Sequence, residues 1–232
     1  MKHIRIVLCL VLSLGAFAPV HAADPPGPVH TVVLVRHGNY LDDPAADPKL
    51  GPHLSPIGVA QAHLVAHALA ALPAFDGLYT SPVQRARDTS AVIARDAFPR
   101  RSFEVVDDLA ECTPPTPVAE VARRETPADM SACKAQLDRV YTRFFTAATD
   151  HDRSDLLVCH GNVTRYLVMR ALGVDPRAWL SMSIGNASIT TIRIDAHGRV
   201  RVIGVGDVGH LPPNLRTSAF GDPPRDLAIP SP

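Results

Sequence analysis

The sequence has 232 residues, of which 46% are hydrophobic and 20% are charged, and its formal net charge is zero. This length and composition are ordinary for one globular domain with a hydrophobic core. Nucleic-acid binding and anionic-membrane binding both require a basic excess, which this chain lacks. We therefore expect no nucleic-acid partner.

The amino terminus predicts an export signal. Lys2 and Arg5 precede a largely apolar stretch, Ile6 to Phe17, and Val20-His21-Ala22 fits a small-x-small cleavage site. We expect residues 1–22 to be a signal peptide and the protein to be periplasmic or secreted, without stable membrane insertion after cleavage. An uncleaved membrane anchor is the alternative, although the apolar stretch is short for a bilayer-spanning helix.

The first predicted strand ends in an unusual polar sequence. Residues 23–28 are a Pro-rich, flexible leader, and the β-branched run after them predicts a buried strand that ends at Arg36-His37-Gly38-Asn39. Ligands in open α/β sheets bind at this end of a strand. Arg36 offers a planar fork of donors suited to phosphate oxygens, and a neutral His37 is a competent nucleophile. Gly38 would allow a tight turn with φ > 0.

Two helix starts follow. Ser55-Pro56 predicts a helix over about residues 56–72, and Ser81-Pro82, after a strand over residues 75–80, predicts a second helix start. The second helix carries Arg85 and Arg87 in its first two turns. A helix start beside a strand end binds anions readily, and arginine adds bidentate contacts. The alternative for these arginines is a solvated helix face.

A metal site on the first helix is not expected. His63 and His67 have the i, i+4 spacing of a zinc-binding pair, but Leu64 stands where a zincin helix has glutamate. No third ligand is apparent nearby, so the pair predicts a surface helix.

An acidic residue follows the next strand, which spans residues 103–106. Glu111 lies in the sequence Leu109-Ala110-Glu111-Cys112, and three prolines between residues 114 and 117 make the following loop stiff. Such a loop would hold Glu111 in a fixed direction, whereas Glu111 alone would be a surface acid. Residues 118–150 are helical in character.

A second histidine ends another strand. The apolar strand over residues 155–159 is followed by His160-Gly161-Asn162 and by a helix over residues 163–172. Two strands thus end in His-Gly, and each could present an imidazole at the same edge of the sheet. Residues 187–194 and 200–205 predict a hairpin at a sheet edge.

Together these motifs resemble the histidine phosphatase (phosphoglycerate-mutase-like) superfamily, and within it the branch of the phosphoglycerate-mutase-like serine/threonine protein phosphatase. The segment from Thr80 to Ala86 resembles the Ser-x-x-x-Arg-Ala element of the family, and Cys159 to Tyr166 is similar to the same branch. The resemblance covers residues 29–216 and implies a three-layer α/β/α sandwich with a mostly parallel central sheet. The Pro/Gly-rich composition of the carboxyl end predicts a disordered tail over residues 217–232. The branch usually has Leu-x-Glu-Gly where this chain has Cys112 in place of the glycine.

The resemblance implies a phosphohistidine mechanism on phosphomonoesters, without metal or cofactor. The substrate would be a phosphoprotein, an envelope phosphosugar or a small ester. A phosphate- or phosphosugar-binding protein with weak or no turnover is the alternative. The implied catalytic residues are His37, Glu111 and His160, and the implied substrate-binding residues are Arg36, Arg85, Asn39 and Asn162.

The cysteines add one hypothesis. Cys9 lies in the predicted signal, and the three that remain can form at most one disulfide. Cys112 adjoins Glu111, and Cys133 lies on a nearby helical segment, so in an oxidising compartment a bond between them would pin the Glu111 loop. Cys159, inside an apolar strand, is expected to be a buried core residue.

Overall fold

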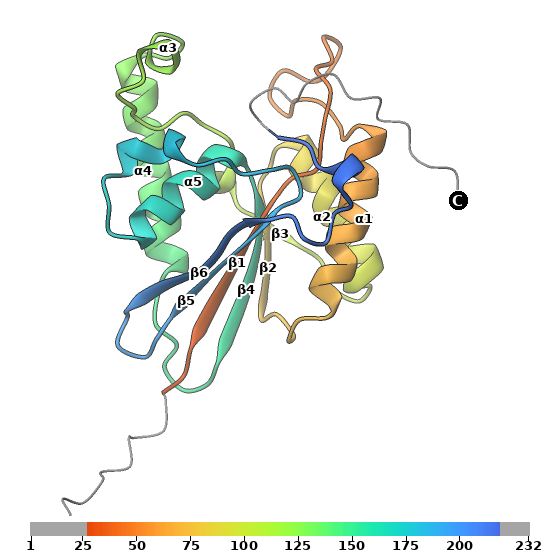
Figure 1. The fold of residues 1–232 in the computed structure, drawn as a ribbon, viewed down its shortest axis with the longest axis vertical. Coiled ribbons are helices and arrows are strands. Elements are labelled where there is room, and N and C mark those ends of the chain that lie inside the picture. Colours follow the sequence, from red (N-terminus) through yellow and green to blue (C-terminus); the bar gives the residue numbers. More distant parts are fainter. Residues whose placement is uncertain (1–26, 219–232) are drawn as a thin grey trace, which may run out of the picture.

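The computed structural model describes residues 27–218, so the predicted signal peptide, most of the leader and residues 219–232 of the predicted tail lie outside the described residues. The described residues build one six-stranded sheet with the strand order β3-β2-β4-β1-β5-β6 (Figure 1). The strands are β1 His30–Arg36, β2 Gly77–Thr80, β3 Glu104–Val105, β4 Arg153–Cys159, β5 Ile189–Ile194 and β6 Val200–Asp207.

Helices cover both faces of this sheet. Figure 1 shows α1 and α2 on one side of the strands and α4 and α5 on the other, which gives three layers. The helices are α1 Pro56–Ala70, α2 Gln84–Ala97, the short α3 Ala119–Ala122, α4 Pro127–Phe144 and α5 Gly161–Ala171. The predicted α/β/α architecture is confirmed.

The sheet is mostly parallel, with β1 and β4 at its centre. β4 runs parallel to both β1 and β2, and β2 runs parallel to β3. β5 and β6 form an antiparallel hairpin at one edge, as the sequence predicted. Because β1 and β4 are parallel neighbours, their carboxyl ends meet at the same sheet edge.

Side-chain alternation along β1 divides the core in two. Val32 and Leu34 pack with residues of α4 and α5, whereas Val33 and Val35 pack with residues of α1 and α2. A strand covered on both faces is apolar throughout, which explains the continuous β-branched run before Arg36.

The predicted helix starts have different outcomes. The Ser55 side chain caps α1 by accepting a hydrogen bond from the Gly58 amide at 3.1 Å, as predicted. The predicted start at Ser81-Pro82 is wrong, because α2 begins at Gln84 with Val83 at its N-cap. Ser81 instead directs its hydroxyl at His160.

The loop after β1 lies directly on the first turn of α1. A Cβ atom on Gly38 would lie 2.5 Å from the Gly58 carbonyl oxygen, and one on Gly58 would lie 1.9 Å from the Asn39 carbonyl oxygen. Gly38 is not among the positive-φ glycines, so the predicted left-handed turn is wrong. Glycine is required there because two backbones touch.

The carboxyl-terminal boundary also differs from the prediction. Thr217, placed in the tail by the sequence, is buried, and its hydroxyl donates to the Asn186 side-chain oxygen at 3.0 Å. Within residues 27–218, no helix combines the length and the hydrophobicity needed to cross a bilayer.

Candidate active site

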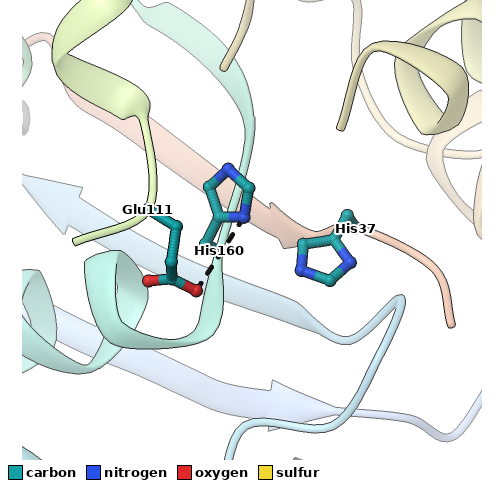
Figure 2. Close-up of side chains that lie close together, drawn as sticks. All are labelled: His37, Glu111 and His160. Carbon is teal, nitrogen blue, oxygen red and sulfur yellow. Dashed lines mark ion pairs between the residues drawn. The ribbon is translucent and has the colours of Figure 1, made fainter. Parts of the chain in front are cut away.

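The two histidines that follow β1 and β4 lie side by side. The strands pair in register up to Arg36 and Cys159, and the His37 amide donates to the Cys159 carbonyl oxygen at 2.9 Å. The two rings meet edge to face, with 5.0 Å between their centroids. In the view of Figure 2, the Glu111 carboxylate and the His37 ring lie to either side of His160, and ligand atoms of the three residues lie within 4.8 Å of one another.

His37 is buried, and its hydrogen bonds identify its tautomer. Nδ1 lies 2.8 Å from the carbonyl oxygen of Gly38, which can only accept, so Nδ1 carries the proton and Nε2 carries the lone pair. Arg85 donates its Nε–H to this lone pair at 3.1 Å. Burial holds the pKa of His37 well below its ordinary range, and His160, Arg36 and Arg85 lower it further. The ring is therefore neutral at physiological pH.

His160 lies between Ser81, in the loop before α2, and Glu111. Its Nε2 lies 2.7 Å from the Ser81 hydroxyl. Its Nδ1 is buried without a hydrogen-bond partner among the described residues and lies 3.8 Å from Oε2 of Glu111, the ion pair drawn in Figure 2. Burial lowers the pKa of His160, and Arg85 and Arg36 lower it further.

The Glu111 side chain is only partly exposed to solvent. Its side chain is 28% exposed, but Oε1 is buried and makes no hydrogen bond within the described residues. Burial raises the pKa of this carboxyl, and the nearby Arg85 and Arg36 offset part of the rise. A carboxyl that keeps its proton more readily can act as a general acid.

Guanidinium groups surround these residues. Arg36 is buried, donates to the Ile184 carbonyl oxygen and keeps a buried Nε without a partner among the described residues. Burial lowers its pKa to about 10, so it stays charged at neutral pH. Arg85 lies over the ring of Tyr40, with 4.7 Å from Cζ to the centroid. Arg87 is exposed and matches the solvated-face alternative.

The two predicted asparagines hold neighbouring loops. Asn39 accepts a hydrogen bond from the Ser55 hydroxyl at 2.7 Å. Asn162 uses both ends of its amide, donating to the Cys112 carbonyl oxygen at 3.1 Å and accepting from Arg165 at 3.1 Å. Both asparagines lie in the wall of a cleft of about 550 Å³ whose other lining residues are Arg36, Tyr40, Leu41, Asp42, Glu111, Gly161, Arg165, Asn186 and Ser218.

Sequence reasoning missed several residues of this site. Ser81 and Arg165 stand inside the motifs that carry the family resemblance, so a signal existed, but Ser81 was interpreted as a helix cap. Tyr40 follows the first motif and packs edge-on to His37, with 5.5 Å between centroids. Asn186 supports the catalytic loop through a hydrogen bond to the His37 carbonyl oxygen at 3.3 Å, and nothing in the sequence indicated it.

The charged side chains around these three residues favour one kind of ligand over another. Ligand atoms of His37, Glu111 and His160 lie within 4.8 Å of one another, a donor set of the kind that holds transition metals. The guanidinium groups of Arg36 and Arg85 act on the same atoms. They disfavour a cation and favour an anion, and their planar donors suit a phosphoryl group.

Comparison with known proteins places the chain in a family. The profile of the Histidine phosphatase superfamily (branch 1) matches residues 32–205, from β1 into β6. The chain belongs to the histidine phosphatase superfamily. The resemblance drawn from the two His-Gly motifs and from the Ser81 to Ala86 segment is therefore confirmed.

The relatives include two mitochondrial phosphatases. The chain is 35% identical over 190 residues to the serine/threonine-protein phosphatase Pgam5, mitochondrial, of Caenorhabditis elegans, covering 79% of this chain and 64% of that protein. It is 33% identical over 192 residues to the Mus musculus protein of the same name, covering 80% and 65%. The chain thus spans less than two thirds of the length of both.

A solved phosphoglycerate mutase shares the fold over most of this chain. The phosphoglycerate mutase of Plasmodium falciparum superposes with a TM-score of 0.55 and 24% identity, over 80% of this chain and 95% of that one. At 24% identity, this similarity shows a shared fold only.

The relatives correct the predicted location. Both are named mitochondrial, which contradicts the expectation of a periplasmic or secreted protein. That expectation was wrong because a short basic and apolar start is not specific to export signals, and membrane anchors share it. The segment concerned, residues 1–22, lies outside the described residues.

Proposed function

We propose that this chain is a phosphatase that hydrolyses phosphomonoesters through a covalent intermediate on His37. The observation that carries the proposal is the 2.8 Å hydrogen bond between His37 Nδ1 and the Gly38 carbonyl oxygen. It fixes the ring and leaves the lone pair on Nε2, beside the guanidinium of Arg85. A fixed, neutral imidazole can attack phosphorus without first losing a proton.

The first step transfers the phosphoryl group to the enzyme. Nε2 of His37 attacks phosphorus in line with the ester oxygen, so the N–P bond forms as the P–O bond to the leaving group breaks. Glu111 gives its proton to the leaving oxygen, and the alcohol departs neutral. The raised pKa of Glu111 supports this role.

The second step releases phosphate. Glu111, now a carboxylate, takes a proton from a water molecule whose oxygen attacks phosphorus, and the P–N bond breaks. Inorganic phosphate leaves, His37 regains its lone pair and Glu111 regains its proton. The same carboxyl therefore acts first as acid and then as base.

Protein hydrogen-bond donors stabilise the negative charge on the transferring phosphoryl group. Arg36, Arg85 and Nδ1 of His160 bind the equatorial oxygens, where negative charge is spread in the transition state. Because the two arginines supply positive charge and His160 donates a hydrogen bond, we propose that no metal ion is required. Asn39 is a secondary contact, and Asn162, whose amide is engaged with Cys112 and Arg165, acts chiefly on the Glu111 loop.

The proposed substrate is a phosphorylated serine or threonine side chain of a protein. The names of the C. elegans and mouse relatives support this class. A small phosphate ester is the second candidate. The envelope phosphosugar depended on export and has lost its basis.

The test is hydrolysis of p-nitrophenyl phosphate by the full chain, with a chelator present, for wild type and for His37→Ala. Turnover that survives the chelator and disappears in the variant supports a metal-independent phosphohistidine enzyme. Radiolabelled phosphate trapped on the wild type should be labile to acid and stable to base, as a phosphoramidate is.

The alternative is a binding protein on the same fold. Equal and negligible rates for wild type and His37→Ala, together with calorimetric binding of a phosphate ester, would support it. A binding site has no need of an in-line nucleophile, so the fixed lone pair of His37 favours the enzyme.

A further inference from the structure

One face of α4 holds the loop that carries the proposed acid. Gln136 donates from Nε2 to two backbone carbonyl oxygens of this loop, at 3.0 Å to Asp108 and 2.9 Å to Ala110. Arg139 pairs with the Asp108 carboxylate at 2.6 Å. These contacts fix the backbone immediately before Glu111.

A covalent bond fixes the residue after it. Cys133 of α4 forms a disulfide with Cys112, as the sequence suggested. Cys133, Gln136 and Arg139 are spaced three residues apart, so they share one helix face. Their partners are residues 108, 110 and 112, which bracket Glu111 on both sides.

The neighbouring helix α5 also holds the loop that carries Glu111. The Cys112 carbonyl oxygen accepts a hydrogen bond from Asn162 in the first turn of α5, and Asn162 in turn accepts one from the buried Arg165. Cys112 is therefore held by α4 through its side chain and by α5 through its backbone. Glu111 has little freedom left except rotation of its own side chain.

We propose that Gln136, Cys112 and Cys133 are positioning residues. The hydrogen bonds of Gln136 and the Cys112–Cys133 disulfide keep the Glu111 carboxyl where it can protonate the leaving group. This inference rests on the proposed phosphatase function. Arg139 contributes less, because its ion pair with Asp108 is exposed to solvent.

The proposal distinguishes between substrates. An alkyl phosphate, such as a phosphoserine peptide, has a poor leaving group that must be protonated as it departs. p-Nitrophenyl phosphate has a good leaving group that needs little help. A loosened Glu111 loop should therefore slow the first substrate and spare the second, whereas damage to the phosphate-binding groups would slow both.

The first test is Gln136→Met, which keeps the side-chain length and removes the donor. We expect kcat/KM for a phosphoserine peptide to fall about tenfold, while kcat/KM for p-nitrophenyl phosphate stays within about twofold. The ratio kcat/KM is the readout because it covers the steps up to departure of the leaving group, whereas the later role of Glu111 as a base is common to both substrates. Arg143→Met is the matched control on the same helix and should keep the ratio of the two rates, because the exposed ion pair of Arg143 is with Glu104 and not with the Glu111 loop.

The second test cleaves the disulfide in the folded wild type. A dithiol such as dithiothreitol supplies two electrons and two protons, giving two thiols and its own cyclic disulfide. The same selective loss on the phosphoserine peptide is expected, with recovery on reoxidation. Circular dichroism before and after reduction separates this effect from unfolding.

The outcomes separate the two ideas. An active wild type whose substrate ratio is unchanged both in Gln136→Met and after reduction overturns the positioning role alone. A wild type inactive on both substrates overturns the proposed function, and this inference with it. If the reduced protein unfolds, the ratio of the two rates in Gln136→Met alone decides whether the positioning role holds.

Discussion

Nε of Arg85 donates to Nε2 of His37 at 3.1 Å, so the proposed phosphate-binding cation and the proposed nucleophile are hydrogen-bonded to each other. A phosphoryl oxygen is a stronger acceptor for a guanidinium than a neutral imidazole nitrogen is. Substrate binding would draw the guanidinium onto the phosphate and expose the lone pair at the moment when phosphorus is in reach.

Arg85→Lys should separate charge from geometry. Lysine keeps the positive charge but lacks the planar fork, so it cannot bind two oxygens while lying beside His37. We expect kcat/KM for p-nitrophenyl phosphate to fall about a hundredfold. The exposed Arg87 on the same helix provides the control, because Arg87→Lys should retain wild-type kinetics. Similar rates in both variants would show that charge alone suffices at position 85.

The pH profile should show Glu111 acting as an acid. Burial raises the pKa of this carboxyl above its ordinary value of 4.5, against the opposing influence of Arg85, Arg36 and Arg165. In the proposed mechanism the protonated form is the active one, so kcat/KM for a phosphoserine peptide should fall as pH rises through this pKa. Glu111→Gln should lose most activity on the peptide, and the activity that remains should lack this alkaline limb. An unchanged limb in the variant would assign it to another group.

The buried histidines should make the fold sensitive to acid. Burial holds the pKa of His37 and of His160 well below the ordinary 6.5, so both stay neutral in the folded state while the unfolded chain takes up protons. The free energy of unfolding should therefore fall as pH drops below about 6.5, by up to about 1.4 kcal/mol per pH unit for each histidine. Urea unfolding at several pH values measures this slope.

A matched variant tests which residues carry that slope. His37→Gln should reduce the slope by up to the contribution of one histidine, about 1.4 kcal/mol per pH unit. A slope that is the same in His37→Gln and wild type would mean that other groups control the acid sensitivity.

Gly58→Ala should destabilise the protein although it lies in a helix. Alanine in place of a helical glycine normally adds up to about 1 kcal/mol of stability. Here its Cβ would lie 1.9 Å from the Asn39 carbonyl oxygen, so α1 and the catalytic loop would have to separate. We expect a loss of about 1–3 kcal/mol and reduced turnover. Gly204→Ala, whose Cβ meets nothing within 4 Å, is the control for thermal unfolding and kinetics.

The sequence predicted the sheet edge better than the contacts on it. Two apolar strands that end in His-Gly are a local pattern, and parallel pairing brings such ends together, so the neighbourhood of His37 and His160 followed from one-dimensional information. Ser81 illustrates the limit. Ser-Pro is a common helix start, and the hydroxyl's actual partner, His160, is 79 residues away.

Gly38 and Asn162 show the same limit in other ways. The sequence explained Gly38 by its own backbone freedom, but the requirement comes from Gly58 on another element. Asn162 was assigned to substrate, yet its amide is divided between Cys112 and Arg165. Long-range packing decides both, and periodicity carries no information about it.

Cys159 gives the protein an internal reporter. It is the free cysteine among residues 27–218, it is buried, and burial raises the pKa of its thiol to about 12. Its side chain packs beneath α4 and α5, so an alkylating reagent can reach it only when these helices separate from the sheet. Because Cys159 directly precedes His160, the rate at which this thiol is labelled measures how often the catalytic centre itself comes apart.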